Sequence, residues 1–208
     1  MSLGRFITLE GGEGAGKSTQ LKAVAAALRA RGLEVVETRE PGGSEGAEAI
    51  RALLLTGGAD RWGPRAEALL FAAARSDHVE RTIRPAIARG AWVLSDRFLD
   101  SSRAYQGMGD LIDADIVALH RIGSGGLLPD RTLVLTLDQA EADARARARD
   151  GAIADRIGGR APDFHRAVAD AFARFALEEP SRIRPIDAAG SPEAVTARLI
   201  DAIADLMP

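Results

Sequence analysis

The sequence predicts an α/β fold, a parallel five-stranded sheet with helices on both faces, and three observations predict it. Short apolar runs alternate along the chain with longer amphipathic stretches. A glycine-rich motif that is typical of phosphate binding directly follows the first apolar run. The 208 residues, 46% of them hydrophobic, contain no linker, repeat or low-complexity tract, so we expect one domain over residues 1–208.

Each strand is predicted where apolar residues run together between turn-forming residues. These runs are residues 6–10, 35–38, 92–95, 132–137 and 183–186. Apolar residues at three- and four-residue spacing predict helices at residues 17–31, 46–55, 66–89, 113–124, 140–149, 163–176 and 192–206. Pro85 is expected to bend the third of these helices. Such sheets bind ligands beyond the carboxyl ends of their strands, so the motifs should converge there.

Composition limits the classes of partner. The formal charge of −3 gives no overall attraction to nucleic acid or to an anionic membrane, so nucleotides fit better than polymers. The absence of cysteine excludes disulfides and thiolate metal sites, and the N-terminal residues run into a strand rather than a secretory segment. No charge-free apolar run approaches the roughly 18 residues of a membrane helix. We therefore expect a cytoplasmic protein without nucleic-acid or membrane partners.

The strongest signal is a phosphate-binding loop, or P-loop, after the first strand, and it predicts a fold of the P-loop NTPase type. Glycines let backbone N–H groups surround a phosphate, while a helix N-terminus and Lys17 balance its charge. Lys17 is expected to reach the β- and γ-phosphates of a nucleotide, and the Ser18 hydroxyl to ligate magnesium. The predicted nucleotide-binding residues are Gly11, Gly12, Glu13, Gly14, Ala15, Gly16, Lys17, Ser18 and Thr19. A glycine-rich turn without a ligand is the alternative, and a chance match has a probability of order 10⁻³.

Two charged residues end the third predicted strand. Asp96 is placed to meet the magnesium ion or its waters, although a surface aspartate in a turn would look the same. Arg97 either touches the phosphate being transferred or is a solvated charge. After the second strand, residues 40–43 (Glu-Pro-Gly-Gly) form a turn that either binds phosphate through its backbone or reverses the chain.

Two further segments suggest a pocket for a base and a phosphate. Phe71 and Arg75 lie four residues apart, so they share one helix face, where the ring could stack on a base and the guanidinium could hold a phosphate. A core phenylalanine beside a surface arginine is the alternative. Residues 101–107 carry hydroxyls, an amide and a phenol, including Ser102, Tyr105 and Gln106. Such groups read base edges and sugar hydroxyls, and polar loop filler would look similar.

A polar, glycine-bearing segment at residues 150–161 is interpreted as a mobile loop between two helices. Arginines at 145, 147 and 149 precede it, and those at 156 and 160 lie within it. They form either a solvated helix face or a short lid, at about residues 149–161, whose arginines neutralise phosphate charge. We expect Arg149 and Arg156 to act catalytically. The histidines lack metal-ligand spacing and are interpreted as structural.

Taken together, these segments resemble the bacterial thymidylate kinases, a branch of the P-loop nucleoside monophosphate kinases. The resemblance spans almost the full length. It rests on residues 6–19 (FITLEGGEGAGKST), 38–43 (TREPGG), 70–75 (LFAAAR), 96–98 (DRF) with 101–107, and the arginine-bearing lid.

The resemblance implies the reaction of ATP with dTMP to give ADP and dTDP, with Mg²⁺. It implies that Phe71 stacks on thymine, that Arg75 and Arg97 hold the acceptor phosphate, and that Ser102 and Tyr105 lie against the base and deoxyribose. It also implies that Glu13 contacts the sugar 3′-hydroxyl, and Arg51 matches an arginine near the acceptor phosphate.

The family divides by the position of its catalytic arginine. Here the P-loop carries none, so the resemblance implies the type whose arginines lie in the lid. It also implies a homodimer, for which apolar faces on residues 66–74 and 113–124 are candidates. This chain departs from the pattern at Phe98, where many relatives have Tyr or His, and at Ser102, where they carry Thr, Asn or Gly.

Two other functions fit the motifs. One is a P-loop kinase that acts on a different nucleotide or on a sugar acid, and the other is a regulator that binds ATP and transfers nothing. The Phe71–Arg75 pair and the segment around Tyr105 favour a kinase with an acceptor pocket over a regulator that only binds ATP. Turnover with a panel of nucleoside monophosphates separates all three.

Overall fold

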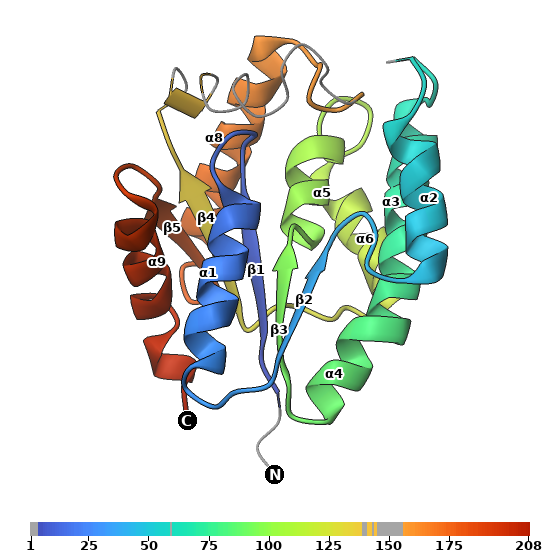
Figure 1. The fold of residues 1–208 in the computed structure, drawn as a ribbon. Helices are drawn as coiled ribbons and strands as arrows, with labels where there is room; N and C mark the ends of the chain where they lie inside the picture. The colour runs from blue at the N-terminus through green and yellow to red at the C-terminus, as the bar shows by residue number, and fades with distance from the viewer. Residues whose placement is uncertain (1–3, 59, 139–140, 143, 145–155) are drawn as a thin grey trace.

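The computed structural model describes residues 4–58, 60–138, 141–142, 144 and 156–208. Its centre is a parallel five-stranded sheet in the order β2-β3-β1-β4-β5 (Figure 1). The strands are β1 (Phe6–Gly11), β2 (Val35–Arg39), β3 (Trp92–Asp96), β4 (Arg131–Thr136) and β5 (Ile183–Asp187). The predicted α/β fold is thereby confirmed, and every observed strand overlaps its predicted range.

Helices cover both faces of this sheet (Figure 1). They are α1 (Lys17–Arg29), α2 (Glu45–Leu55), α3 (Pro64–His78), α4 (Arg84–Ala88), α5 (Leu99–Gln106), α6 (Asp113–Ser124), α8 (Pro162–Glu178) and α9 (Pro192–Asp201). Leu28 of α1 and Leu199 of α9 pack on one face against Ile7 and Leu133. On the other face Phe98 and Phe175 anchor two further apolar clusters. β1 is buried along its whole length, including the polar side chains of Thr8 and Glu10.

The long helix predicted over residues 66–89 is wrong as a single element. It consists of α3, a π-helical turn at Val79–Ile83 and the short helix α4. Pro85 has no N–H to bond to the carbonyl four residues earlier and its ring crowds that carbonyl, so the hydrogen-bond ladder changes before the proline. The backbone N–H of Arg84 accordingly donates to Val79 O.

Other differences lie at helix ends and in one missed helix. The last predicted helix ends at Asp201 and is followed by a 3₁₀ turn at Ala204–Leu206. Helix α5 was not predicted, because its polar side chains suggested a loop, whereas all eight of its residues are buried. Most of the helix predicted at residues 140–149 and most of the loop at 150–161 lie outside the described residues.

The carboxyl ends of β1, β2 and β3 carry the predicted motifs to one edge of the sheet. The P-loop follows β1, the Glu-Pro-Gly-Gly turn follows β2, and Asp96 ends β3. The start of β1 and the C-terminus lie at the opposite end of the sheet (Figure 1). Among the described residues, none of the helices is long and apolar enough to cross a membrane.

Candidate active site

The P-loop wraps around the N-terminus of α1. Gly14 has a φ of 74°, and a Cβ there would lie 2.1 Å from Ala142 O, so only glycine fits. Gly16 is the N-cap of α1, and a glycine offers the first helical N–H groups no side-chain acceptor. These amides and the positive end of the helix dipole are suited to an anion.

Lys17 lies folded back against the P-loop backbone. Its Nζ donates to Gly12 O at 2.7 Å and to Gly11 O at 3.1 Å. Burial lowers the pKa of Lys17 to about 8, and the positive charge of Arg97 adds to this effect. A negatively charged phosphate beside Nζ would favour the protonated form and give the ammonium a better partner than neutral carbonyls.

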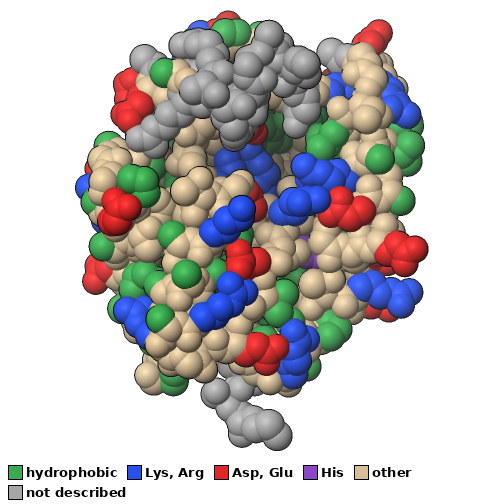
Figure 2. All heavy atoms as spheres, in the orientation of Figure 1, with side chains coloured by type: hydrophobic (Ala, Val, Ile, Leu, Met, Phe, Trp, Pro, Cys, Tyr) green, Lys and Arg blue, Asp and Glu red, His purple; other side chains and the backbone are tan. Residues whose placement is uncertain are grey.

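A cavity in front of the P-loop, here called the P-loop cavity, is lined by residues 13–20 and by Arg39, Asp96 and Arg97. Figure 2 shows basic side chains gathered around a hollow between α1 and α2. At its floor Ser18 Oγ donates to Asp96 Oδ2 at 2.5 Å. The structure therefore brings together the two residues predicted to meet a metal ion.

Arg97 is held in a left-handed backbone conformation, with a φ of 72°. Its Nη2 donates to Glu13 Oε1 at 2.6 Å, and its Nη1 donates to Gly11 O at 3.1 Å and Ser101 Oγ at 3.0 Å. The guanidinium also lies 5.1 Å from the centroid of the Tyr105 ring. Four contacts, two from the P-loop and two from α5, thus fix this cation next to the P-loop.

A second pocket, here called the α5 pocket, opens between α3 and α5. All residues predicted to bind an acceptor line it: Glu13, Arg51, Phe71, Arg75, Arg97, Ser102, Tyr105 and Gln106. They come from four separate segments, so their convergence is a property of the fold. Glu13, Glu40, Arg51 and Arg97 line this pocket and the P-loop cavity alike. The two cavities therefore meet at these four side chains.

Arg75 is oriented by three acceptors. Its Nε donates to Glu40 Oε2 at 2.8 Å, and its Nη2 donates to Ser102 Oγ at 2.7 Å and Phe98 O at 3.2 Å. Among the described residues Nη1 has no hydrogen-bond partner. An arginine in the pocket wall with one edge unused is suited to an oxyanion.

Sequence reasoning missed the partners of Arg75. Glu40 is buried and uses its second oxygen for His78 Nδ1 at 3.0 Å, while His78 Nε2 lies 2.7 Å from Thr38 Oγ1. The Glu-Pro-Gly-Gly turn was expected either to bind phosphate through its backbone or to reverse the chain, and neither interpretation gave the Glu40 side chain a role. Glu40 and Arg75 are 35 residues apart in the chain, so no local sequence pattern indicates that they pair.

Helix α5 supplies polar groups to the pocket wall. The Tyr105 hydroxyl is buried and has no hydrogen-bond partner among the described residues. An orphaned buried hydroxyl is costly unless a ligand completes it. Gln106 Nε2 donates to Glu67 Oε1 at 3.0 Å, so this amide nitrogen is already used within the protein. Arg51 Nη1 donates to Pro41 O at 2.6 Å.

The structure describes Arg156 and Arg160 of the predicted lid, whereas Arg149 lies outside the described residues. Arg156 is buried: its Nε donates to Leu54 O at 2.8 Å and its Nη2 to Glu67 Oε2 at 2.6 Å. Arg160 also pairs with Glu67. Burial acts to raise the pKa of Glu67, but hydrogen bonds from Gln106 and Arg156 and the charge of Arg160 bring it below its usual range. Arg156 is therefore not a solvated side chain, and Glu67 holds it in this structure.

Comparison with known proteins identifies the family. The family model described as thymidylate kinase matches residues 9–199. The thymidylate kinase of Rhizorhabdus wittichii is 67% identical over 206 residues, covering 99% of both chains. The thymidylate kinase of Caulobacter vibrioides is 50% identical over 204 residues, covering 98% of this chain and 97% of that one.

A solved structure agrees with these sequences. The crystal structure of thymidylate kinase from Ehrlichia chaffeensis has a TM-score of 0.75 and 29% identity, and covers 97% of this chain and 99% of that chain. The chain therefore belongs to the thymidylate kinase family, the kinases that use ATP to phosphorylate dTMP to dTDP for dTTP synthesis.

Proposed function

We propose that the P-loop cavity holds ATP and the α5 pocket holds dTMP, with phosphoryl transfer where the two cavities meet. One observation carries this assignment: Arg97 lines both cavities while its guanidinium is fixed against Gly11, Glu13 and Ser101. A cation at that junction can contact the phosphate of one nucleotide and the group transferred from the other.

Different side chains of the α5 pocket contact the base, the deoxyribose and the phosphate of the acceptor nucleotide. Phe71 stacks on the base and Ser102 and Gln106 lie at its edge. Tyr105 lies against the deoxyribose, where its orphaned hydroxyl supports a polar contact, and Glu13 receives the 3′-hydroxyl. Arg75 holds the phosphate through the Nη1 edge that its protein partners leave unused, and Arg51 lies nearby in the same wall.

Transfer then needs positioning and charge neutralisation. A phosphate oxygen of dTMP attacks the γ-phosphorus of ATP in line, the bond from that phosphorus to the bridging oxygen breaks, and ADP leaves with its electron pair. Lys17 and Arg97 balance the charge that spreads over the transferred group, and Arg149 and Arg156 complete this set from the lid. No general base is required, because the attacking phosphate oxygen carries its own charge.

Mg²⁺ fits the oxygen donors at the floor of the P-loop cavity. The Ser18 hydroxyl and the Asp96 carboxylate are 2.5 Å apart, and both are hard oxygen ligands. Among the described residues, no group of three or more acidic, His or Cys side chains could hold a metal. Magnesium usually takes one or two protein ligands together with phosphate oxygens and water, so the pair suits an ion that arrives with ATP. There it would neutralise phosphate charge.

We also infer a homodimer in the cytoplasm. Helices α3 and α6 pack on each other and leave large apolar side chains exposed, namely Leu69, Val117 and Ile122. Exposed apolar groups on adjoining helices are a common feature of subunit interfaces. The lack of cysteine agrees with a reducing compartment.

Turnover with ATP and a panel of nucleoside monophosphates tests the site. The wild type should favour dTMP, and Lys17→Ala should lose about 100-fold or more in turnover with the fold intact. Lys22→Ala is the matched control, because Lys22 is the second lysine of α1 and is exposed. If folded Lys17→Ala turned over at a near-normal rate, the assignment of the P-loop cavity as the ATP site would be wrong. ATP binding without ADP formation would favour a regulator instead.

A further inference from the structure

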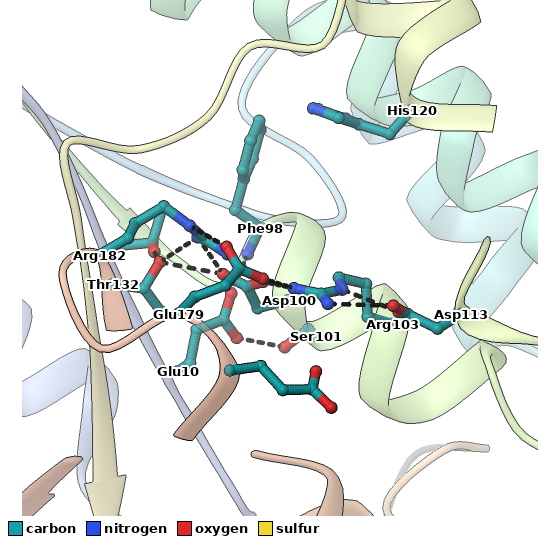
Figure 3. Close-up of polar contacts among 12 residues, drawn as sticks. Glu10, Phe98, Asp100, Ser101, Arg103, Asp113, His120, Thr132, Glu179 and Arg182 are labelled. Carbon is teal, nitrogen blue, oxygen red and sulfur yellow. Dashed lines mark hydrogen bonds and ion pairs between the residues drawn. The ribbon is translucent and has the colours of Figure 1, made fainter. Parts of the chain in front are cut away.

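A carboxylate under the P-loop is unused by the reaction as described. Glu10 is the last residue but one of β1 and is 0% exposed. Its Oε1 accepts from the backbone N–H of Phe98 at 2.8 Å, and its Oε2 accepts from Ser101 Oγ at 2.5 Å (Figure 3). Glu10 thus connects the central strand to the start of α5.

These two contacts lie on either side of Arg97. Phe98 directly follows Arg97, so a bond to its N–H fixes the peptide plane that leaves the left-handed residue. Ser101 donates to Glu10 and accepts from Arg97 Nη1 at 3.0 Å. Glu10 therefore constrains the backbone beside Arg97 and, through Ser101, one end of its guanidinium.

The far side of α5 is fixed independently. Asp100 accepts from Arg182 at 2.6 and 2.9 Å, from Arg103 at 3.0 Å and from Thr132 at 3.0 Å (Figure 3). This network ties the helix to β4 and to the segment before β5. Without Glu10, α5 would remain anchored, and the link to Arg97 alone would be lost.

The two carboxylates have opposite electrostatic surroundings. Burial, followed by the charge of Asp100, raises the pKa of Glu10 to about 8. Burial also acts to raise the pKa of Asp100, but hydrogen bonds and charges from Arg182 and Arg103 bring it below its usual value. Unlike Asp100, Glu10 accepts, among the described residues, only from neutral donors, the Phe98 N–H and the Ser101 hydroxyl. Burying its negative charge therefore costs desolvation free energy that no cation among these residues offsets through a direct contact.

We propose that Glu10 is a positioning residue that orients Arg97 toward the acceptor phosphate through Phe98 and Ser101. This inference rests on the proposed role of Arg97 in the acceptor site. The ionised carboxylate suits the task because it accepts from both donors at once, so the variants below are compared above about pH 8, where Glu10 is ionised. In Glu10→Gln the amide oxygen can still accept from Phe98, but the amide nitrogen cannot accept the proton that Ser101 donates to Glu10.

The test compares ligands that differ by one phosphate. Glu10→Gln should weaken binding of dTMP, and kcat/KM for dTMP, by about 10- to 100-fold, because the phosphate loses a well-placed cation. Binding of thymidine, which lacks the phosphate, and of ATP should change little. Thr8→Val is the matched control: it removes a buried hydrogen bond to Thr132 on the same strand face and should leave dTMP binding unchanged.

A second variant covers the case in which Glu10→Gln does not fold. Ser101→Ala removes the hydroxyl link and keeps the buried carboxylate, so it should also weaken dTMP selectively. When both variants fold, their effects on dTMP should not add, because they interrupt the same path. Equal losses for thymidine, ATP and dTMP in the variants would overturn the inference, as would unchanged dTMP binding. A wild type that fails to phosphorylate dTMP would instead overturn the proposed function.

Discussion

Arg75 and Glu40 form a buried ion pair in which Nε donates to Oε2 across 2.8 Å. Glu40 is fixed in turn by His78, so the guanidinium is oriented before any ligand arrives. The pair also means that a charge-deleting change at Arg75 would leave a buried carboxylate without its partner, which is strongly destabilising. Tests of the acceptor site therefore need a variant that keeps the charge.

Arg75→Lys is such a variant. It keeps a cation near Glu40 but loses the fork that offers Nη1 to a phosphate, so KM for dTMP should rise by about 10- to 100-fold, the weight of a charge-assisted hydrogen bond. KM for ATP should change little. Arg81→Lys, at an exposed position on the following π-helical turn, is the control. A comparable rise in both KM values would show that Arg75 serves the structure and not the acceptor.

Arg156 of the predicted lid is paired with Glu67. Arg149→Ala and Arg156→Ala should each lower kcat by roughly 10- to 1,000-fold with little change in KM for dTMP, the pattern of a contact made in the transition state. Lysine at either position should restore only part of the rate.

For Arg156 a double variant separates catalysis from packing. If its only task is to neutralise Glu67, to which it donates at 2.6 Å, then Glu67→Gln combined with Arg156→Ala should recover the wild-type kcat. We expect no such recovery. Steady-state kinetics of the two single variants and the double variant decide the matter.

His120 should make stability depend on pH. Burial lowers its pKa to about 4, and its Nε2, which bonds to Leu127 O at 2.8 Å, must carry the proton of a neutral ring. The unfolded chain binds a proton below about pH 6.5, whereas the folded chain resists it until about pH 4. The free energy of unfolding should therefore fall by at most about 1.4 kcal/mol per pH unit as the pH drops through this window.

Denaturant titration of the wild type and His120→Gln across that range measures the effect. Glutamine can still donate to Leu127 O but does not titrate, so the difference in stability between the two proteins should shift in favour of the variant as the pH falls. A difference that stays constant with pH contradicts the prediction.

The dimer prediction concerns the exposed apolar side chains of α3 and α6. Ile122 is 78% exposed, and Ile122→Glu should produce a monomer in light scattering or sedimentation. Burial of a carboxylate without a partner is costly enough to disrupt an interface. Leu177→Glu on α8, where the leucine is 83% exposed, is the matched control and should leave the mass unchanged. An Ile122→Glu protein of wild-type mass would exclude this face.

Much of the fold followed from local pattern. The three central strands β1, β3 and β4 are almost fully buried, so their apolar residues were visible in the sequence. The P-loop motif predicted both the turn after β1 and the start of α1. The residues predicted for the acceptor site meet in one pocket, because helices α2, α3 and α5 place most of these side chains beside the carboxyl ends of the strands. Their individual roles remain predictions.

What the sequence did not reveal depends on partners far away in the chain. Helix α5 buries polar side chains against residues such as Glu10 and Arg182, so it lacks the apolar period that marks most helices. The contacts of Glu40 with Arg75 and of Glu67 with Arg156 join residues far apart in sequence. The spacing of charged residues along the chain does not predict such pairs, because the fold alone brings the partners together.

The left-handed backbone at Arg97 implies a trade between stability and activity. A φ of 72° suits glycine and costs other residues about 1–2 kcal/mol. Arg97→Gly should therefore be more stable than Arg97→Ala, the reverse of the usual order, although both variants lose the guanidinium. Glycine would relieve the backbone strain at position 97, but it would remove the guanidinium that we propose binds the acceptor phosphate, and denaturant titration of the two variants measures the difference.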